Sequence, residues 1–151
     1  MTEEIGNANL GQYTLRAALC RQTYKHEGVC IYVLKDIQFN TTTLDQYNKE
    51  KDLEICALML CLLSSSFILI CIYRSPTGNF TYFLNQLESI LNKLYERSTE
   101  LVLCGDFNLN YLNDNSRKHL SDSLLASFRL CSTVKFPTRI FNKFINRQYL
   151  Y

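Results

Sequence analysis

An uncharged, strongly apolar run from Ile55 to Tyr73 constrains the fold more than any other feature. A membrane-spanning helix needs about 20 such residues, so a single membrane helix is one interpretation. Three consecutive serines at positions 64–66 interrupt the run in its middle, however, and the half from Phe67 to Tyr73 is rich in β-branched and aromatic residues, which favour strands. We therefore predict two buried strands that are joined by a serine turn, and no membrane segment.

Further strands are predicted on both sides of this pair. Tyr13 to Cys20 forms one candidate, and a polar turn from Arg21 to Gly28 follows it. Val29 to Leu34 is apolar throughout, which predicts a strand buried on both faces. The stretch from Asn40 to Lys51 is rich in polar residues and predicts a loop.

Two helices are predicted from apolar residues that recur at helical spacing. Asn79 is suited to cap the first helix, and Asn115 precedes the second. The apolar stripe is Phe80, Phe83, Leu84, Leu87, Ile90, Leu91 and Leu94 in the first helix, and Leu120, Leu124, Leu125 and Phe128 in the second. Strands are also predicted at Leu101–Cys104, between the helices, and at Thr133–Phe136. Strands that alternate with helices and with hairpins predict a layered, mixed α/β domain.

Charge and cysteine content narrow the function classes. The formal charge of the 151 residues is +2, which does not suggest a broad basic surface for nucleic acid. The chain has seven cysteines, an odd number, without a C-x-x-C pair, and only two histidines, which argues against a zinc site. We predict reduced thiols and an intracellular protein, in the nucleus or the cytoplasm.

The segment Gly105-Asp106-Phe107-Asn108 is the sharpest chemical feature. It follows a predicted buried strand, and residues two apart in an extended chain point to the same side. The carboxylate of Asp106 and the amide of Asn108 can therefore hold a water molecule and a phosphate oxygen together. The alternative interpretation is a plain turn closed by an Asx hydrogen bond.

The ordered motifs of the chain resemble the endonuclease/exonuclease/phosphatase class, in the branch carried by non-LTR retrotransposons. The resemblance extends from about Gly11 to about Arg139. It rests on His26-Glu27-Gly28-Val29-Cys30-Ile31-Tyr32-Val33, Ile72-Tyr73-Arg74-Ser75-Pro76, Leu101-Val102-Leu103-Cys104-Gly105-Asp106-Phe107-Asn108 and Phe136-Pro137-Thr138-Arg139. It implies a layered α/β sandwich with mixed sheets and flanking helices, of which residues 1–151 form a partial domain.

The resemblance also implies roles for individual residues. Asp106 would position or activate the attacking water, and Asn108 would contact the scissile phosphate. Tyr73 would lie near the same phosphate, and the hydroxyl of Thr138 would bind it. The class uses Mg²⁺, and in intact elements of this branch the endonuclease nicks target DNA for a following reverse transcriptase domain.

The departures from the family pattern concern both flanks of the motif set. The family's early strands bear an Asn and a metal-binding Glu, and its last motif is S-D-H, whereas Ile140 to Tyr151 contains neither Asp nor His. His26 and His119 are expected in solvent. We therefore predict an incomplete catalytic set without identifiable metal ligands, and little cleavage by this chain alone. The alternatives are a non-catalytic module that binds phosphate, DNA or a protein, and an active phosphodiesterase with unusual ligands.

Overall fold

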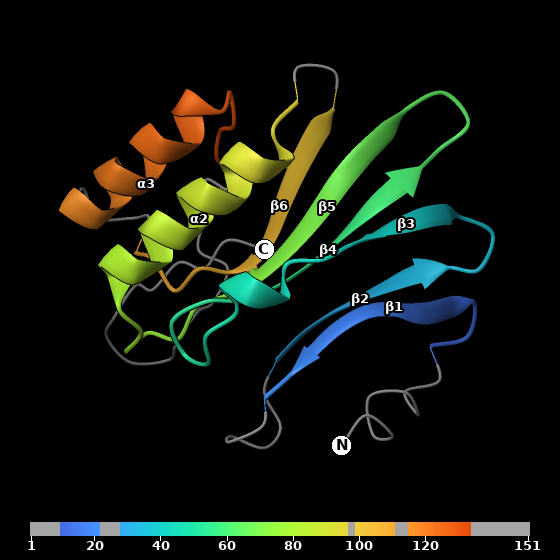
Figure 1. Cartoon of the computed structure of the whole chain (residues 1–151), viewed down its shortest axis with the longest axis horizontal. Helices are drawn as coiled ribbons and strands as arrows, with labels where there is room; N and C mark the ends of the chain where they lie inside the picture. The colour runs from blue at the N-terminus through green and yellow to red at the C-terminus, as the bar shows by residue number, and fades with distance from the viewer. Residues whose placement is uncertain (1–9, 22–27, 97–98, 111–114, 134–151) are drawn as a thin grey trace, which may run out of the picture.

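The computed structural model describes residues 10–21, 28–96, 99–110 and 115–133, and these form three layers (Figure 1). Two helices cover one face of a four-stranded sheet, and a two-stranded sheet covers the other face. In chain order the elements are β1 (Tyr13–Cys20), β2 (Gly28–Leu34), β3 (Gln38–Thr42), the 3-10 helix η1 (Asp45–Tyr47), β4 (Glu54–Cys61), β5 (Ser66–Tyr73), α2 (Phe80–Leu94), β6 (Glu100–Asp106) and α3 (Ser116–Ser127).

The larger sheet has the strand order β3-β4-β5-β6. Strands β4 and β5 form the antiparallel pair predicted from the apolar run, with Cys61 opposite Ser66 at the serine turn. Strand β6 is parallel to β5, and α2 makes the crossover between them. Among the described residues no helix combines the length and the apolar character that crossing a membrane requires. The mixed α/β architecture is therefore as predicted.

Strand β5 explains why its sequence is apolar without a break. Ile68, Ile70 and Ile72 pack against the helices, whereas Leu69 and Cys71 pack against the smaller sheet. A strand in the middle layer must bury both of its faces, so the period-two alternation of polar and apolar residues disappears. The same layer position excludes charged residues from most of the strand.

The prediction that the strand Val29–Leu34 is buried on both faces was wrong. Val29, Ile31 and Val33 are buried against the larger sheet, but Cys30, which points the other way, is exposed. The strand itself is confirmed as part of β2. Because β2 lies in an outer layer, only one of its faces is covered, and its apolar composition did not reveal which layer it occupies.

The predicted loop from Asn40 to Lys51 is partly ordered as regular structure. Residues 40–42 belong to β3, whose backbone pairs with β4 from Asn40 opposite Met59 to Thr42 opposite Ala57. Helix η1 follows at Asp45. Polar side chains are tolerated in β3 because it is an edge strand with a solvent-facing side.

Both predicted helices are present. In α2 the Asn79 side chain accepts a hydrogen bond from the backbone N–H of Tyr82 at 3.0 Å, which confirms the predicted cap. In α3 Leu125 is buried, but Leu120 is 55% exposed, so the predicted stripe was wrong at that position. Helix α3 packs mainly beside α2, which leaves part of its apolar face uncovered. Thr133 is not in a strand, and 134–136 lies outside the described residues.

The seven cysteines are free thiols. Three of them, Cys56, Cys71 and Cys104, form one row across β4, β5 and β6. The hydrogen bond with Cys104 lowers the pKa of Cys71, whereas the hydrogen bond with Cys56 and burial raise it. The raising effects are larger, and the pKa of Cys71 is raised to about 12. A thiol with such a pKa is almost fully protonated at neutral pH, so this row is part of the core rather than a nucleophilic site.

Candidate functional site

The last residues of two parallel strands bring two of the predicted site residues together. Tyr73 ends β5 and Asp106 ends β6, and the two are direct partners in the parallel register. Partners in register point to the same face of a sheet, so the phenol and the carboxylate are neighbours. The segments Arg74–Asn79 and Phe107–Asn110 leave from this same edge.

The turn at Asp106 is closed by an Asx hydrogen bond. The Oδ1 atom of Asp106 accepts the backbone N–H of Asn108 at 3.0 Å, and Asn108 has the left-handed φ of 49°. The turn interpretation of this motif is therefore correct. It does not compete with a role in chemistry, because the bond holds the carboxylate in a defined position at the strand end.

The side chain of Asn108 is engaged by the neighbouring segment. Its Nδ2 donates to the backbone carbonyl of Arg74 at 2.7 Å. A carboxamide nitrogen has two N–H donors, so this bond leaves a second donor on Nδ2. The Asn108 amide thus both ties the two strand ends together and retains a donor for a ligand oxygen.

Arg74 is central to this edge, and sequence reasoning assigned it no role. Its guanidinium donates to three backbone carbonyls, those of Phe107 at 2.9 Å, Gly78 at 3.1 Å and Asn108 at 2.8 Å. Its backbone N–H also donates to the Asp106 carbonyl at 2.9 Å, and the residue is only 1% exposed. Arg74 therefore clamps the turn after β6 to the segment after β5. The sequence pattern that could have revealed this role is a charged residue directly after the uncharged run that ends at Tyr73.

A second buried arginine lies on the other side of Tyr73. Arg21, directly after the end of β1, is 3% exposed, although it was predicted to lie in a polar turn. Its Nε and Nη2 atoms lie 2.7 and 2.6 Å from Oε1 of Glu54, which is fully buried. Glu54 begins β4 and is the register partner of Tyr73. The row Glu54–Tyr73–Asp106 thus crosses three strands at the edge of the sheet.

The segment before β4 supports the start of α2. Asp52 Oδ1 accepts the backbone N–H of Asn79 at 2.7 Å, and Asp52 Oδ2 forms an ion pair with Lys49 at 2.6 Å. The Lys51 carbonyl accepts the N–H of Ser75 at 2.9 Å. Burial raises the pKa of Asp52, but the hydrogen bonds from Lys49 and Asn79 outweigh it, and the pKa lies below its ordinary value.

The depressed pKa of Asp52 predicts that this support weakens in acid. A carboxyl group whose pKa is lower in the folded than in the unfolded chain stabilises the fold above its unfolded pKa of about 3.9, and the contribution is lost as the pH falls through the folded pKa. In urea unfolding, Asp52→Asn is expected to be less stable than wild type at neutral pH, and the difference should shrink near pH 3. Lys49→Gln should reduce the pH-dependent part, and an equal difference at both pH values would contradict the assignment.

The other predicted site residues do not join this cluster. Thr138 and His26 lie outside the described residues. His119 is in α3 and exposed, as expected. Within 10–21, 28–96, 99–110 and 115–133, no three His, Cys, Asp or Glu side chains are grouped as a metal site requires.

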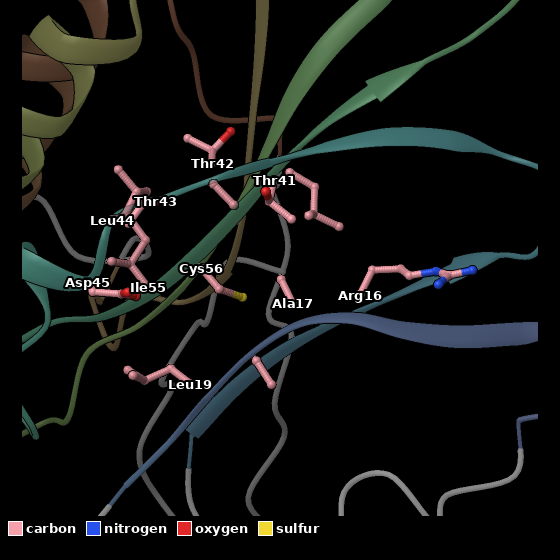
Figure 2. A pocket seen from close by; sticks show the side chains of 13 residues that line it. Arg16, Ala17, Leu19, Thr41, Thr42, Thr43, Leu44, Asp45, Ile55 and Cys56 are labelled. Carbon is pink, nitrogen blue, oxygen red and sulfur yellow. The ribbon is translucent and has the colours of Figure 1, made fainter. Parts of the chain in front are cut away.

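A cavity lies away from this edge. It has a volume of about 270 Å³ and lies between β1 and the β3–β4 side of the larger sheet (Figure 2). Thr41, Thr42 and Asp45 contribute polar groups, whereas Leu19 and Cys56 line an apolar part. Neither Tyr73 nor Asp106 lines it. The cavity exists because the smaller sheet, with two strands, leaves the β3 side of the sandwich partly uncovered.

The fold of this chain has a counterpart among solved structures. No protein-family model and no curated protein match the sequence. Among solved structures, the endonuclease domain of TRAS1, a telomere-specific non-LTR retrotransposon, matches with a TM-score of 0.71 and 14% sequence identity. The match covers 92% of this chain and 64% of the TRAS1 domain, so the chain spans just under two thirds of that domain. This chain therefore has the mixed α/β fold of a non-LTR retrotransposon endonuclease domain.

Proposed function

We propose that residues 1–151 form part of a Mg²⁺-dependent phosphodiesterase domain that acts on DNA, of the kind that nicks target DNA for a reverse transcriptase in non-LTR retrotransposons. Asp106, Asn108 and Tyr73 are the proposed catalytic residues, and Asn108 and Thr138 the proposed phosphate ligands. The observation that carries the proposal is the in-register pair Tyr73–Asp106, with Asn108 held beside it, at the carboxyl ends of parallel β5 and β6. The fold shared with the TRAS1 domain supports it.

The chemistry of this edge suits a phosphodiester. The phenol of Tyr73 and the remaining Nδ2 donor of Asn108 are neutral hydrogen-bond donors, which match phosphate oxygens. The Asp106 carboxylate accepts from a backbone N–H through one oxygen, and its charge suits a water molecule or a hydrated cation. Positioning and neutralisation of charge are the main contributions that such hydrolysis requires.

The residues at this edge could hold Mg²⁺ through a single carboxylate. Mg²⁺ keeps several waters and is commonly held by one or two carboxylates together with substrate phosphates. Asp106 is the carboxylate proposed for this, because it ends β6 beside Tyr73 and Asn108. When bound, Mg²⁺ would neutralise charge on the phosphate. We expect the chain to lack the metal-binding Glu and the terminal His of the family, and the loss of a general acid or base costs about 10²–10⁴-fold in rate.

The proposal predicts magnesium-assisted DNA binding with little cleavage. Binding of a short fluorescent duplex DNA is measured by anisotropy with and without Mg²⁺, and nicking of supercoiled plasmid is followed in parallel. Wild type should bind more tightly with Mg²⁺ and leave the plasmid supercoiled. Asp106→Asn keeps an oxygen for the Asn108 N–H but loses the charge, so its affinity should not respond to Mg²⁺. Tyr73→Phe should bind about 10-fold more weakly, the value of one hydrogen bond to a charged group.

Glu88→Gln on the exposed side of α2 is the matched control, since it makes the same change in net charge as Asp106→Asn. It should retain the magnesium response. If Asp106→Asn and Tyr73→Phe bind DNA as wild type does, the phosphodiesterase proposal fails, and a module that binds another protein is favoured. If the plasmid relaxes and Asp106→Asn abolishes the relaxation, the nuclease assignment stands and the expected inactivity of the chain is wrong.

A further inference from the structure

A buried ion pair lies directly behind Tyr73 and takes no part in the proposed chemistry. Glu54, Tyr73 and Asp106 are register partners across β4, β5 and β6, so their side chains lie on the same face of the sheet. That face is covered by the smaller sheet, whose strand β1 ends immediately before Arg21. Arg21 therefore enters the row from the opposite layer.

Arg21 contacts two residues of this row, Glu54 and Tyr73. Its guanidinium is held by Glu54 Oε1, which also accepts the backbone N–H of Lys51 at 3.0 Å. The same guanidinium lies over the Tyr73 ring, 5.2 Å from its centre. Burial lowers the pKa of Arg21, but Glu54 and then Tyr73 raise it, and the net result is a raised pKa.

Stability alone is a weak reason for this arrangement. Two charges removed from water lose hydration that their mutual attraction only partly restores, and apolar replacements of such pairs are often neutral or stabilising. The Oε2 atom of Glu54 is buried and has no hydrogen-bond partner in the described part of the chain, which adds to the cost. The pair therefore calls for a contribution other than a simple tie between the two sheets.

The contact with the Tyr73 ring supplies one. A guanidinium within about 6 Å of a ring centre is attracted to the face of the ring, and Glu54 holds this guanidinium in place. We propose that Arg21, held by Glu54, is a positioning residue that fixes the Tyr73 ring so that its hydroxyl meets a phosphate oxygen of bound DNA. This inference rests on the proposed function, in which Tyr73 meets that phosphate.

The first test follows the Tyr73 phenol without any ligand. The chain is labelled with ¹³Cζ-tyrosine, and Tyr73→Phe identifies the Tyr73 signal among those of the ten tyrosines. Arg21→Lys and the isosteric Glu54→Gln are expected to shift this signal and leave the others in place. Arg16→Lys is the matched control, because Arg16 lies in the strand that leads to Arg21 and also lies over an aromatic ring, that of Phe39 at 4.9 Å. A Tyr73 signal that stays unchanged in folded Arg21→Lys and Glu54→Gln overturns the inference, whatever the protein does with DNA.

The second test is a double-mutant cycle on binding of a short duplex DNA in Mg²⁺. Tyr73→Phe and Arg21→Lys should each weaken binding, Tyr73→Phe by about 10-fold. If Arg21 acts through the phenol, the double variant should bind no more weakly than Tyr73→Phe alone. Losses that multiply overturn the inference and indicate a structural tie or a direct contact of Arg21 with DNA. If the NMR signal shifts as expected but Tyr73→Phe binds DNA normally, the proposed role of Tyr73 fails, while the contact of Arg21 with the Tyr73 ring stands.

Discussion

Replacing Gly105 by alanine is expected to disrupt the larger sheet and to leave most of the chain unfolded or insoluble. Gly105 has a φ of +121°, and a Cβ atom at this position would lie 1.9 Å from the backbone oxygen of Ile72 and 2.8 Å from its carbonyl carbon and nitrogen. Those neighbours are backbone atoms of β5, so they cannot move aside without breaking the β5–β6 pairing. The expected cost is at least about 4 kcal/mol, close to the total stability of many domains.

The measurement is urea unfolding followed by circular dichroism, with the soluble yield recorded for each variant. Gly11→Ala is the matched control, because Gly11 also has a positive φ of +66° but has no atom within 4 Å of an added Cβ. It should cost only about 1–2 kcal/mol, the strain of a left-handed alanine. Equal costs for the two substitutions would show that backbone conformation, and not the close approach of β5, accounts for the glycine at 105.

Replacing Arg74 by methionine is expected to cost about 3 kcal/mol or more. The guanidinium satisfies the carbonyls of Gly78, Phe107 and Asn108, and its removal leaves three backbone acceptors without that partner in a buried setting. The segments after β5 and β6 would then separate, and Asn108 would lose the fixed position of its own acceptor, the Arg74 carbonyl. Chemical unfolding gives the stability, and DNA binding in Mg²⁺ reports on the edge.

Two further substitutions separate the hydrogen bonds of Arg74 from its charge and its ring contacts. Arg74→Lys keeps the charge but cannot reproduce the planar set of donors, so an intermediate loss of stability is expected. Arg117→Met is the matched control, since Arg117 lies 5.3 Å from the same Phe80 ring that Arg74 approaches at 5.7 Å, but on the exposed side. It should cost less than about 1 kcal/mol. If Arg74→Met lowers the stability no more than Arg117→Met does, the hydrogen bonds of the Arg74 guanidinium do not stabilise the fold.

Local sequence patterns were sufficient to predict a turn or a helix start when the residues responsible lie within a few positions of each other. The serines at 64–66 predicted the hairpin, because a polar triplet cannot continue a buried strand. Asn79 predicted the start of α2, because its side chain meets a backbone N–H only three residues away. Asp106 and Tyr73 were both placed near the reacting phosphate through the family resemblance, and the parallel register of their strands brings them together.

The sequence did not predict which layer each strand occupies or which charged side chains are buried. Val29–Leu34 and Phe67–Tyr73 are similarly apolar, yet only the second lies in the middle layer, and that depends on which strands pair. Arg21 was taken for a polar turn residue, because its partner Glu54 is 33 residues away and lies in the other sheet. An ion pair of this kind exists only after two distant segments have been packed together.

The sequence by itself determined the strands other than β3, both α-helices, their order and the residues at the ends of β5 and β6, because turns, caps and apolar periodicity act over a few neighbouring residues. The tertiary structure decided which faces are buried and which charges are held inside. Arg74 joins two loops more than 30 residues apart, and Arg21 reaches Glu54 and Tyr73 from another layer. Such contacts depend on the three-dimensional arrangement of strands, which no local pattern encodes.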